Sequence, residues 1–194
     1  MKRRGSQLSN NLFVLSGPSG SGKNTVYNGV AALIPEIEKT VSATTRAPRE
    51  GEVDGVDYYF ISVKEFEKKI RADEFVEFVK YGDNYYGTLR SEIKRLADIG
   101  KIAVLIIEVR GALNVKRVFP ESESIFILPP SIDVLRERIL GRGQNTEEET
   151  EKRLRIAEQE MLEKEKYDHR VINDDLEVCV NEVADIIRKG VKKK

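Results

Sequence analysis

The chain has 194 residues with 33 basic and 33 acidic side chains, so its formal net charge is zero. This length is enough for a domain with a hydrophobic core, and the balanced charge gives no overall field that would favour nucleic acid or a membrane as a partner. The single cysteine, Cys179, excludes an intramolecular disulfide and a cysteine metal cluster and fits a reducing environment. No apolar run reaches the length of a signal-peptide core or a membrane span, so we expect a cytoplasmic protein.

A phosphate-binding loop is predicted directly after a short apolar strand at residues 12–16. The segment fits the pattern G-x-x-x-x-G-K, with Gly17, Gly22 and Lys23 at its defining positions, and it leads into a predicted helix. Glycine lets the backbone wrap closely around an anion, the helix adds its positive N-terminal end, and the lysine adds a cation for the outer phosphate oxygens. We therefore expect a bound nucleoside triphosphate. The loop residues expected to bind it are Gly17, Pro18, Ser19, Gly20, Ser21, Gly22, Lys23, Asn24 and Thr25.

Residues from about 40 to 88 form short runs rich in Thr, Tyr and Phe, separated by turn signals. This pattern predicts a small, mostly antiparallel insertion. The insertion contains two arginines three positions apart, Arg46 and Arg49, together with several tyrosines. Guanidinium groups and tyrosine hydroxyls suit a phosphate dianion, although a strand edge with salt bridges and packed tyrosines explains the same composition.

The rest of the chain alternates between strands and helices. Apolar runs at 102–107 and 124–128 read as buried parallel strands, and helical patterns follow them at 111–118 and 132–140. A weaker strand candidate, Val171-Ile172, precedes a last helix from about Leu176 to Arg188. This alternation predicts an α/β fold in which helices flank a parallel sheet core.

The segment at about 141–162 is charged throughout and has few apolar anchors. We expect it to pack weakly and to move as a helical lid, while a solvated surface helix is the alternative. The lone histidine, His169, is expected to be a surface or packing residue and not a catalytic base.

The chain closely resembles the guanylate kinases over residues of about 12–187. The resemblance is carried by Gly-Pro-Ser-Gly-x-Gly-Lys in the loop and by Ser-x-Thr-Thr-Arg-x-Pro-Arg-x-Gly-Glu at 42–52. It implies a phosphate-loop α/β fold with a nucleotide-monophosphate-binding insertion and a lid. The implied division of a single domain at 1–194 is a core at about 1–38, 89–140 and 163–194, a GMP-binding insertion at about 39–88 and a lid at about 141–162.

The resemblance also implies a reaction and its site residues. The reaction is reversible transfer of the γ-phosphoryl group of ATP to GMP, giving ADP and GDP, with Mg²⁺ as the cofactor, in cytoplasmic purine metabolism. The implied partners are ATP and GMP, without nucleic acid or membrane, and a homo-oligomer stays open. The residues implied for the GMP phosphate are Arg46, Arg49, Tyr58 and Tyr86, with Glu52 nearby. Those implied for the guanine base are Ser42, Glu77 and Thr88. Those implied for the transferring phosphoryl group are Lys23, Arg138, Arg142 and Arg153, and Asn173 is implied near the adenine of ATP.

The chemistry of guanine supports the role of Glu77. Guanine presents an N1–H and an N2 amino group side by side, and one carboxylate accepts from both. Adenine offers an acceptor at N1, which would leave a buried carboxylate charged and unpaired, so the discrimination is strong. Hydroxyls at Ser42 and Thr88 supply donors towards guanine O6 or N7. The alternative is that Glu77 is an exposed charge on an alternating strand.

Four positions depart from the family pattern. Asn24 stands where Ser or Thr usually follows the loop lysine, and Arg110 stands where glutamine is usual. Ile106 and Glu108 stand where the family usually carries two acids on one face of a strand end. We expect Ile106 to be a core or pocket-wall residue, which leaves Glu108 as the acid that serves Mg²⁺, directly or through water.

Two other functions remain open at this level. One is a catalytically inactive guanylate-kinase-like module that binds proteins. The other is a kinase of another small phosphorylated acceptor. The intact loop with Lys23 and the arginines of the lid region favour the enzyme.

Overall fold

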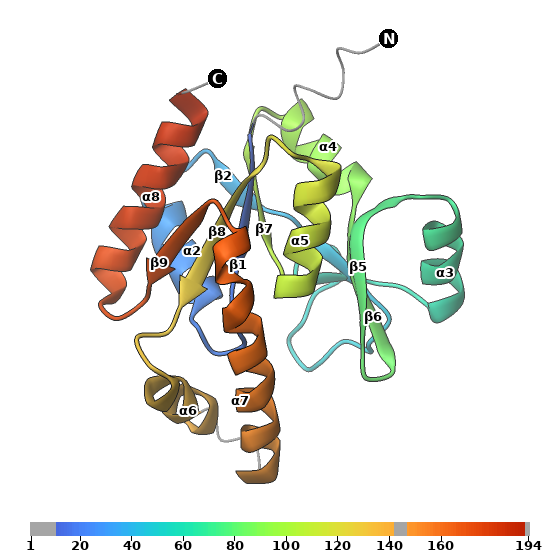
Figure 1. Ribbon diagram of the computed structural model, residues 1–194. Coiled ribbons are helices and arrows are strands. Elements are labelled where there is room, and N and C mark those ends of the chain that lie inside the picture. The colour runs from blue at the N-terminus through green and yellow to red at the C-terminus, as the bar shows by residue number, and fades with distance from the viewer. Residues whose placement is uncertain (1–10, 142–146, 193–194) are drawn as a thin grey trace.

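The computed structural model describes residues 11–141 and 147–192, and within these ranges the strands form two sheets (Figure 1). The larger sheet has five parallel strands in the order β2-β7-β1-β8-β9. Their bounds are Leu12–Ser16 for β1, Ile37–Lys39 for β2, Ile102–Ile106 for β7, Glu123–Leu128 for β8 and His169–Ile172 for β9. The apolar runs predicted as buried strands are confirmed as β1, β7 and β8. β2 has three residues, too few for periodicity to reveal it.

Helices cover both faces of this sheet, which confirms the predicted α/β class. The bounds are Lys23–Leu33 for α2, Arg90–Asp98 for α4, Val109–Val118 for α5 and Leu176–Lys192 for α8. Alternation along β1 sorts the side chains between the two faces: Phe13 and Leu15 pack with α2 and α8, whereas Leu12 and Val14 pack with α4 and α5. None of the helices in the described ranges combines the length and apolar character needed to cross a bilayer.

The smaller sheet is the insertion, which lies to the right in Figure 1. Its four strands have the order β4-β3-β6-β5. Their bounds are Ser42–Thr44 for β3, Tyr58–Phe60 for β4, Phe75–Tyr81 for β5 and Asn84–Leu89 for β6. β6 pairs antiparallel with both β3 and β5, as the turn signals predict, but β3 and β4 pair in parallel. The insertion is therefore a mixed sheet.

One face of the insertion packs on a helix, α3 (Val63–Arg71). This helix begins after Ser62, whose side chain accepts a hydrogen bond from the Glu65 N–H in the manner of an N-cap. Phe66 is its buried anchor and stacks on the Phe75 ring at 4.2 Å and on the Tyr85 ring at 5.2 Å between centroids. Because α3 covers this face, the other face of the sheet is the one left for a ligand.

Two helices, α6 (Ile132–Leu140) and α7 (Glu147–Met161), lie below the carboxyl ends of the large sheet in Figure 1, and a short 3₁₀ turn, Leu162–Lys166, follows α7. The charge of this segment predicts weak packing, but the structure contains an apolar seam between the two helices. The seam consists of Ile132, Leu135, Ile139, Leu154 and Ala157. A few apolar residues therefore anchor α7 on α6, although the charged composition of the segment does not indicate this packing.

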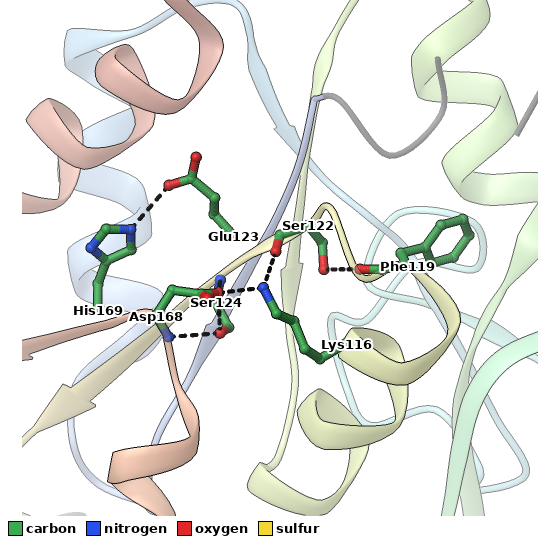
Figure 2. A network of polar contacts seen from close by, with 7 residues as sticks. All are labelled: Lys116, Phe119, Ser122, Glu123, Ser124, Asp168 and His169. Atoms are coloured by element: carbon green, nitrogen blue, oxygen red, sulfur yellow. Dashed lines mark hydrogen bonds and ion pairs between the residues drawn. The ribbon is translucent and has the colours of Figure 1, made fainter. Parts of the chain in front are cut away.

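A polar network ties the amino ends of β8 and β9 to α5 (Figure 2). Asp168 accepts hydrogen bonds from Lys116 Nζ at 2.7 Å, from the Ser124 N–H at 2.8 Å and from Ser124 Oγ at 2.7 Å. His169 Nε2 lies 3.0 Å from Glu123 Oε2, so the half-buried histidine makes a polar contact within this network. The network lies at the amino ends of the strands, away from the phosphate loop at their carboxyl ends, and it fixes β8, β9 and α5 relative to one another.

Candidate active site

The phosphate loop joins the carboxyl end of β1 to α2, between the neighbouring strands β7 and β8. Gly17 has φ +142° and Gly22 has φ +92°, a region that favours glycine, and a Cβ on Gly17 would lie 2.3 Å from the Ile127 carbonyl oxygen. Lys23 Nζ donates to the carbonyl oxygens of Gly17 at 2.7 Å and Pro18 at 3.1 Å. The lysine therefore lies along the loop, with its ammonium group at the loop carbonyls.

The residues implied for the donor nucleotide come from three elements. Asn173 follows β9, and its side-chain amide donates to the Ser21 carbonyl of the loop at 2.8 Å. Arg138, on α6, donates from Nη2 to the Asn173 carbonyl at 2.9 Å. Arg153 is half-buried on α7, and Arg142 lies outside the described residues. The structure thus brings Asn173 and Arg138 together beside the loop.

The face of the insertion that α3 leaves open carries five residues implied for GMP. They are Ser42, Tyr58, Glu77, Tyr86 and Thr88. Side chains directly opposite one another in neighbouring strands point to the same face, and so do residues two apart in one strand. Ser42 pairs with Tyr58, Thr88 pairs with Glu77, and the pairing of Thr44 with Tyr86 joins the two sets. The register of four strands therefore gathers these residues on a single surface.

Glu77 is buried, with only 5% of its surface exposed, so it is not a solvated strand charge. Thr88 Oγ1 donates to Glu77 Oε1 at 2.9 Å. Burial raises the pKa of Glu77 to about 7, although the hydrogen bonds from Thr88 oppose this rise. The sequence suggests that the Thr88 hydroxyl donates to the guanine base. In this arrangement its proton is directed at Glu77 instead, so the hydroxyl orients the carboxylate.

The α5 helix approaches Glu77 closely on its other side. A Cβ added to Gly111 would lie 2.6 Å from Glu77 Oε2 and 3.2 Å from its Cδ. Glycine at this position, in the first turn of α5, leaves the space that the carboxylate occupies. The chemistry of the sequence motifs does not single out Gly111, because only the fold brings it to β5.

Arg46 is held in place by an acid and two rings. Its Nη1 and Nη2 atoms donate to the two carboxylate oxygens of Glu52, each at 2.8 Å, and the Arg49 N–H donates to the same carboxylate at 2.7 Å. Its guanidinium carbon lies 5.4 Å from the Tyr58 ring centroid and 5.7 Å from that of Phe60. The bond from Arg46, followed by that from Arg49, lowers the pKa of Glu52 to about 2. Glu52 therefore orients the arginine that is implied for the acceptor phosphate.

The strand-end pair differs from the expectation. β7 ends at Ile106, and Glu108 is the residue before α5, so the two side chains are not alternating residues of one strand. Ile106 packs with the cluster under α2 and α8, whereas Ile107 packs with the cluster under α4 and α5. The expected core role of Ile106 agrees with this packing. Glu108 is exposed. The start of α5 at Val109 is what interrupts the strand pattern.

Glu160, near the end of α7, belongs to the same region although no motif points to it. Burial raises the pKa of Glu160 to about 7, the negative charge of Glu108 adds to the rise, and Lys23 and Arg110 oppose it. The charges of Glu108, Lys23 and Arg110 therefore act on Glu160. The sequence offers little signal for it, because two steps of three residues turn Glu160 roughly 120° away from the buried Leu154 around the helix axis.

The donor set fits a magnesium ion held mainly by phosphate and water. The described residues contain no group of three or more His, Cys, Asp or Glu side chains arranged to hold a metal. Asn24 and Thr25 are exposed in the first turn of α2. Mg²⁺ usually keeps several waters and takes one or two carboxylates together with substrate phosphates, and the carboxylates of this region, Glu108 and Glu160, are compatible with that coordination.

Comparison with known proteins matches the guanylate kinase family model to residues 9–190. A guanylate kinase of Halalkalibacterium halodurans is 47% identical over 176 residues, which cover 91% of this chain and 86% of that protein. One of Nostoc sp. is 44% identical over 176 residues, covering 91% and 88%. The crystal structure of guanylate kinase from Anaplasma phagocytophilum superposes with a TM-score of 0.71 at 34% identity, covering 92% of this chain and 84% of that one.

Proposed function

Since this chain belongs to the guanylate kinase family, we propose that it transfers the γ-phosphoryl group of ATP to GMP, reversibly, giving ADP and GDP. The observation that supports this most is a buried carboxylate, Glu77, on the same sheet face as Tyr58 and Tyr86, in a chain that also carries an intact phosphate loop. An ATP:GMP phosphotransferase needs both a donor cradle and an acceptor site that reads guanine. The inactive binding module needs neither.

In this proposal, the acceptor half separates base reading from phosphate binding. Glu77 accepts from guanine N1–H and from the N2 amino group, and Thr88 orients its carboxylate. Arg46 and Arg49, with the hydroxyls of the two tyrosines, bind the phosphate. Glu52 holds Arg46 ready, so little side-chain entropy is lost when GMP arrives. The residues that act here belong to the insertion at about 39–88.

The donor half acts by positioning and by neutralising charge. The loop amides and Lys23 hold the polyphosphate of ATP, and arginines of the proposed lid at about 141–162 and of α6 face the transferring group. These arginines are Arg138, Arg142 and Arg153. Magnesium bound to ATP supplies further positive charge, and Glu108 with Glu160 would hold its water shell. The remaining segments, at about 1–38, 89–140 and 163–194, are the core of the cytoplasmic enzyme that we propose.

An assay of ADP formation against GMP, AMP, CMP and UMP, with ATP and magnesium, tests the function. GMP should be the preferred acceptor by a wide margin. Arg46→Ala should mainly raise the KM for GMP, because it removes a ground-state phosphate contact, whereas Arg153→Ala should mainly lower kcat. If the purified protein consumed no ATP with GMP, the binding module would be the better description.

The carboxylate Glu108 has its own test. Glu108→Gln should lower kcat, and raising the magnesium concentration should recover part of the loss, because the amide weakens only the hold on the metal and its water. The matched control is Glu177→Gln, which changes an exposed glutamate in the first turn of α8. Full turnover of the Glu108 variant at limiting magnesium would exclude it from the surroundings of the metal.

A further inference from the structure

Three hydrogen bonds hold Asn173 against the phosphate loop, two of them made by its backbone and one by its side chain. Its backbone N–H donates to the Leu128 carbonyl at 2.8 Å, which continues the pairing of β8 with β9 by one residue. Its side-chain Nδ2 donates to the Ser21 carbonyl at 2.8 Å, and its own carbonyl accepts from Arg138 Nη2 at 2.9 Å. Asn173 is 5% exposed and Ser21 is fully buried, so these bonds form away from water.

The bond to Ser21 fixes the direction of a particular peptide group. In a trans peptide the carbonyl of one residue and the N–H of the next point to opposite sides. A donor that holds the Ser21 carbonyl on the protein side therefore turns the Gly22 N–H to the other side, where the loop amides face an anion. The fit is close, because a Cβ on Gly22 would lie 2.3 Å from Asn173 Nδ2.

We propose that Asn173 is a positioning residue of the phosphate loop: by donating to the Ser21 carbonyl it sets the Gly22 N–H towards the polyphosphate of the donor nucleotide. This role differs from the adenine contact that the family resemblance implies, because it acts on phosphate whatever base is attached. The inference rests on the proposed function in that it takes the loop to bind ATP.

An amide is suited to this task in a way that its isosteres are not. Asparagine carries two donors on Nδ2, whereas an ionised aspartate only accepts and would face the Ser21 carbonyl with a repulsive charge. Arg138 adds to the arrangement, because it joins α6 to Asn173 and so links this helix to the loop through two consecutive hydrogen bonds.

The test compares ligands that contain phosphate, adenine or both. Calorimetry on the full chain would measure the affinity of inorganic tripolyphosphate, ATP and adenosine for the unaltered protein, Asn173→Asp and Asn173→Ser. In both variants we expect the affinities for tripolyphosphate and for ATP to fall by the same factor, about tenfold or more, because one oriented amide is lost in each case. The KM for GMP should not change. Asn181→Asp is the matched control, since Asn181 is exposed on α8 and bonds only within that helix among the described residues.

Each outcome decides between the roles. Weaker ATP binding with unchanged tripolyphosphate binding would make Asn173 an adenine contact and overturn the proposal, as would unchanged affinity for both ligands. Should both variants fail to fold, the side-chain amide resonances of Asn173 in the unaltered protein still decide: tripolyphosphate should shift them if this amide supports the loop, whereas a response to adenosine alone would indicate an adenine contact. A protein that binds tripolyphosphate in this way but does not phosphorylate GMP would refute the proposed function and leave the role of Asn173 intact.

Discussion

Glu77 is a carboxylate that the fold buries with a hydroxyl as its partner and with no ion pair to any described residue. Charge is costly there, which is why burial raises its pKa from 4.5 to about 7. An acid with a raised pKa stabilises the fold most when protonated. That contribution is present below pH 4.5 and is lost as the pH rises through about 7, a change on the order of 3 kcal/mol. The protein thus gives up stability at neutral pH to keep a buried carboxylate on this sheet face, the group that we propose as the acceptor for guanine.

The binding of GMP should therefore weaken below pH 7. The ionised carboxylate is the form that accepts two hydrogen bonds, so the KM for GMP should rise by roughly tenfold for each pH unit below the pKa of Glu77. The phosphate of GMP also titrates near this range, with a pKa of about 6. Glu77→Gln separates the two, because it retains the titration of the ligand and loses that of the protein. An equally steep profile in the variant would assign the whole effect to GMP.

The stability of the same pair of proteins provides a second measurement. The melting temperature of wild type relative to Glu77→Gln should fall as the pH is raised from about 5 to 8, because only wild type acquires a buried charge over that range. A difference in melting temperature that stays constant with pH would mean that Glu77 is not buried as a charge in solution.

Gly111→Ala should damage guanine recognition without damaging the fold. Alanine favours a helix over glycine by about 1 kcal/mol, but its Cβ would lie 2.6 Å from Glu77 Oε2 and displace the carboxylate. We expect the KM for GMP to rise severalfold while the KM for ATP and the melting temperature change little. Gly29→Ala is the matched control, since its Cβ would meet Val180 between α2 and α8 and should lower stability without affecting GMP.

At the level of the elements, the large sheet was predictable and the acceptor face was not. Buried parallel strands such as β1 and β7 are continuous apolar runs, which a sequence displays directly. The helix α3 is clearly amphipathic, with Val63, Phe66 and Ile70 at helical spacing, but it stands among short Tyr- and Phe-rich runs that indicate strands. The gathering of Ser42 with Glu77 depends on strand register, which is set by pairing between distant segments. The resemblance to the family indicates those residues, and only the fold shows that they lie on one face.

Asp168 should be important for stability and not for catalysis. Burial alone would raise its pKa, but the hydrogen bonds from Lys116 and Ser124 outweigh burial and lower it. The stabilisation is therefore present at neutral pH and is lost in acid. Asp168→Asn should lower the melting temperature at pH 7 with the KM values unchanged, and the gap to wild type should narrow as the pH falls towards the pKa of Asp168. An altered KM for GMP would show that the network of Figure 2 reaches the site.

For the molecule as a whole, a chain of hydrogen bonds joins the insertion to the large sheet. Tyr59 on β4 donates to Glu92 Oε2 at 2.8 Å, Arg95 Nε donates to Glu92 Oε1 at 2.8 Å, and Arg95 Nη2 donates to Glu38 Oε1 on β2 at 2.8 Å. Glu92 is 2% exposed, so its charge depends on these partners. These hydrogen bonds therefore link the insertion to the large sheet through α4.

Tyr59→Phe should loosen the insertion selectively. It removes a hydrogen bond to a buried charge, a loss of about 1.5–3 kcal/mol. Hydrogen exchange should accelerate in β3 and β6 while β1 and β7 keep their protection. Tyr85→Phe is a fair control, because none of the hydrogen bonds among the described residues involves the Tyr85 hydroxyl. Uniform acceleration across both sheets would mean that the two halves unfold as one unit.

The placement of the tyrosines gives the protein an optical property. The chain has seven tyrosines and no tryptophan, and Tyr58, Tyr59, Tyr81, Tyr85 and Tyr86 all lie on the strands of the insertion. Intrinsic fluorescence therefore reports mainly on the acceptor half, whereas far-UV ellipticity is dominated by the helices around the large sheet. A urea titration followed by both signals shows whether the two halves separate, since coincident midpoints indicate one cooperative unit and an earlier fluorescence midpoint indicates an insertion that melts first.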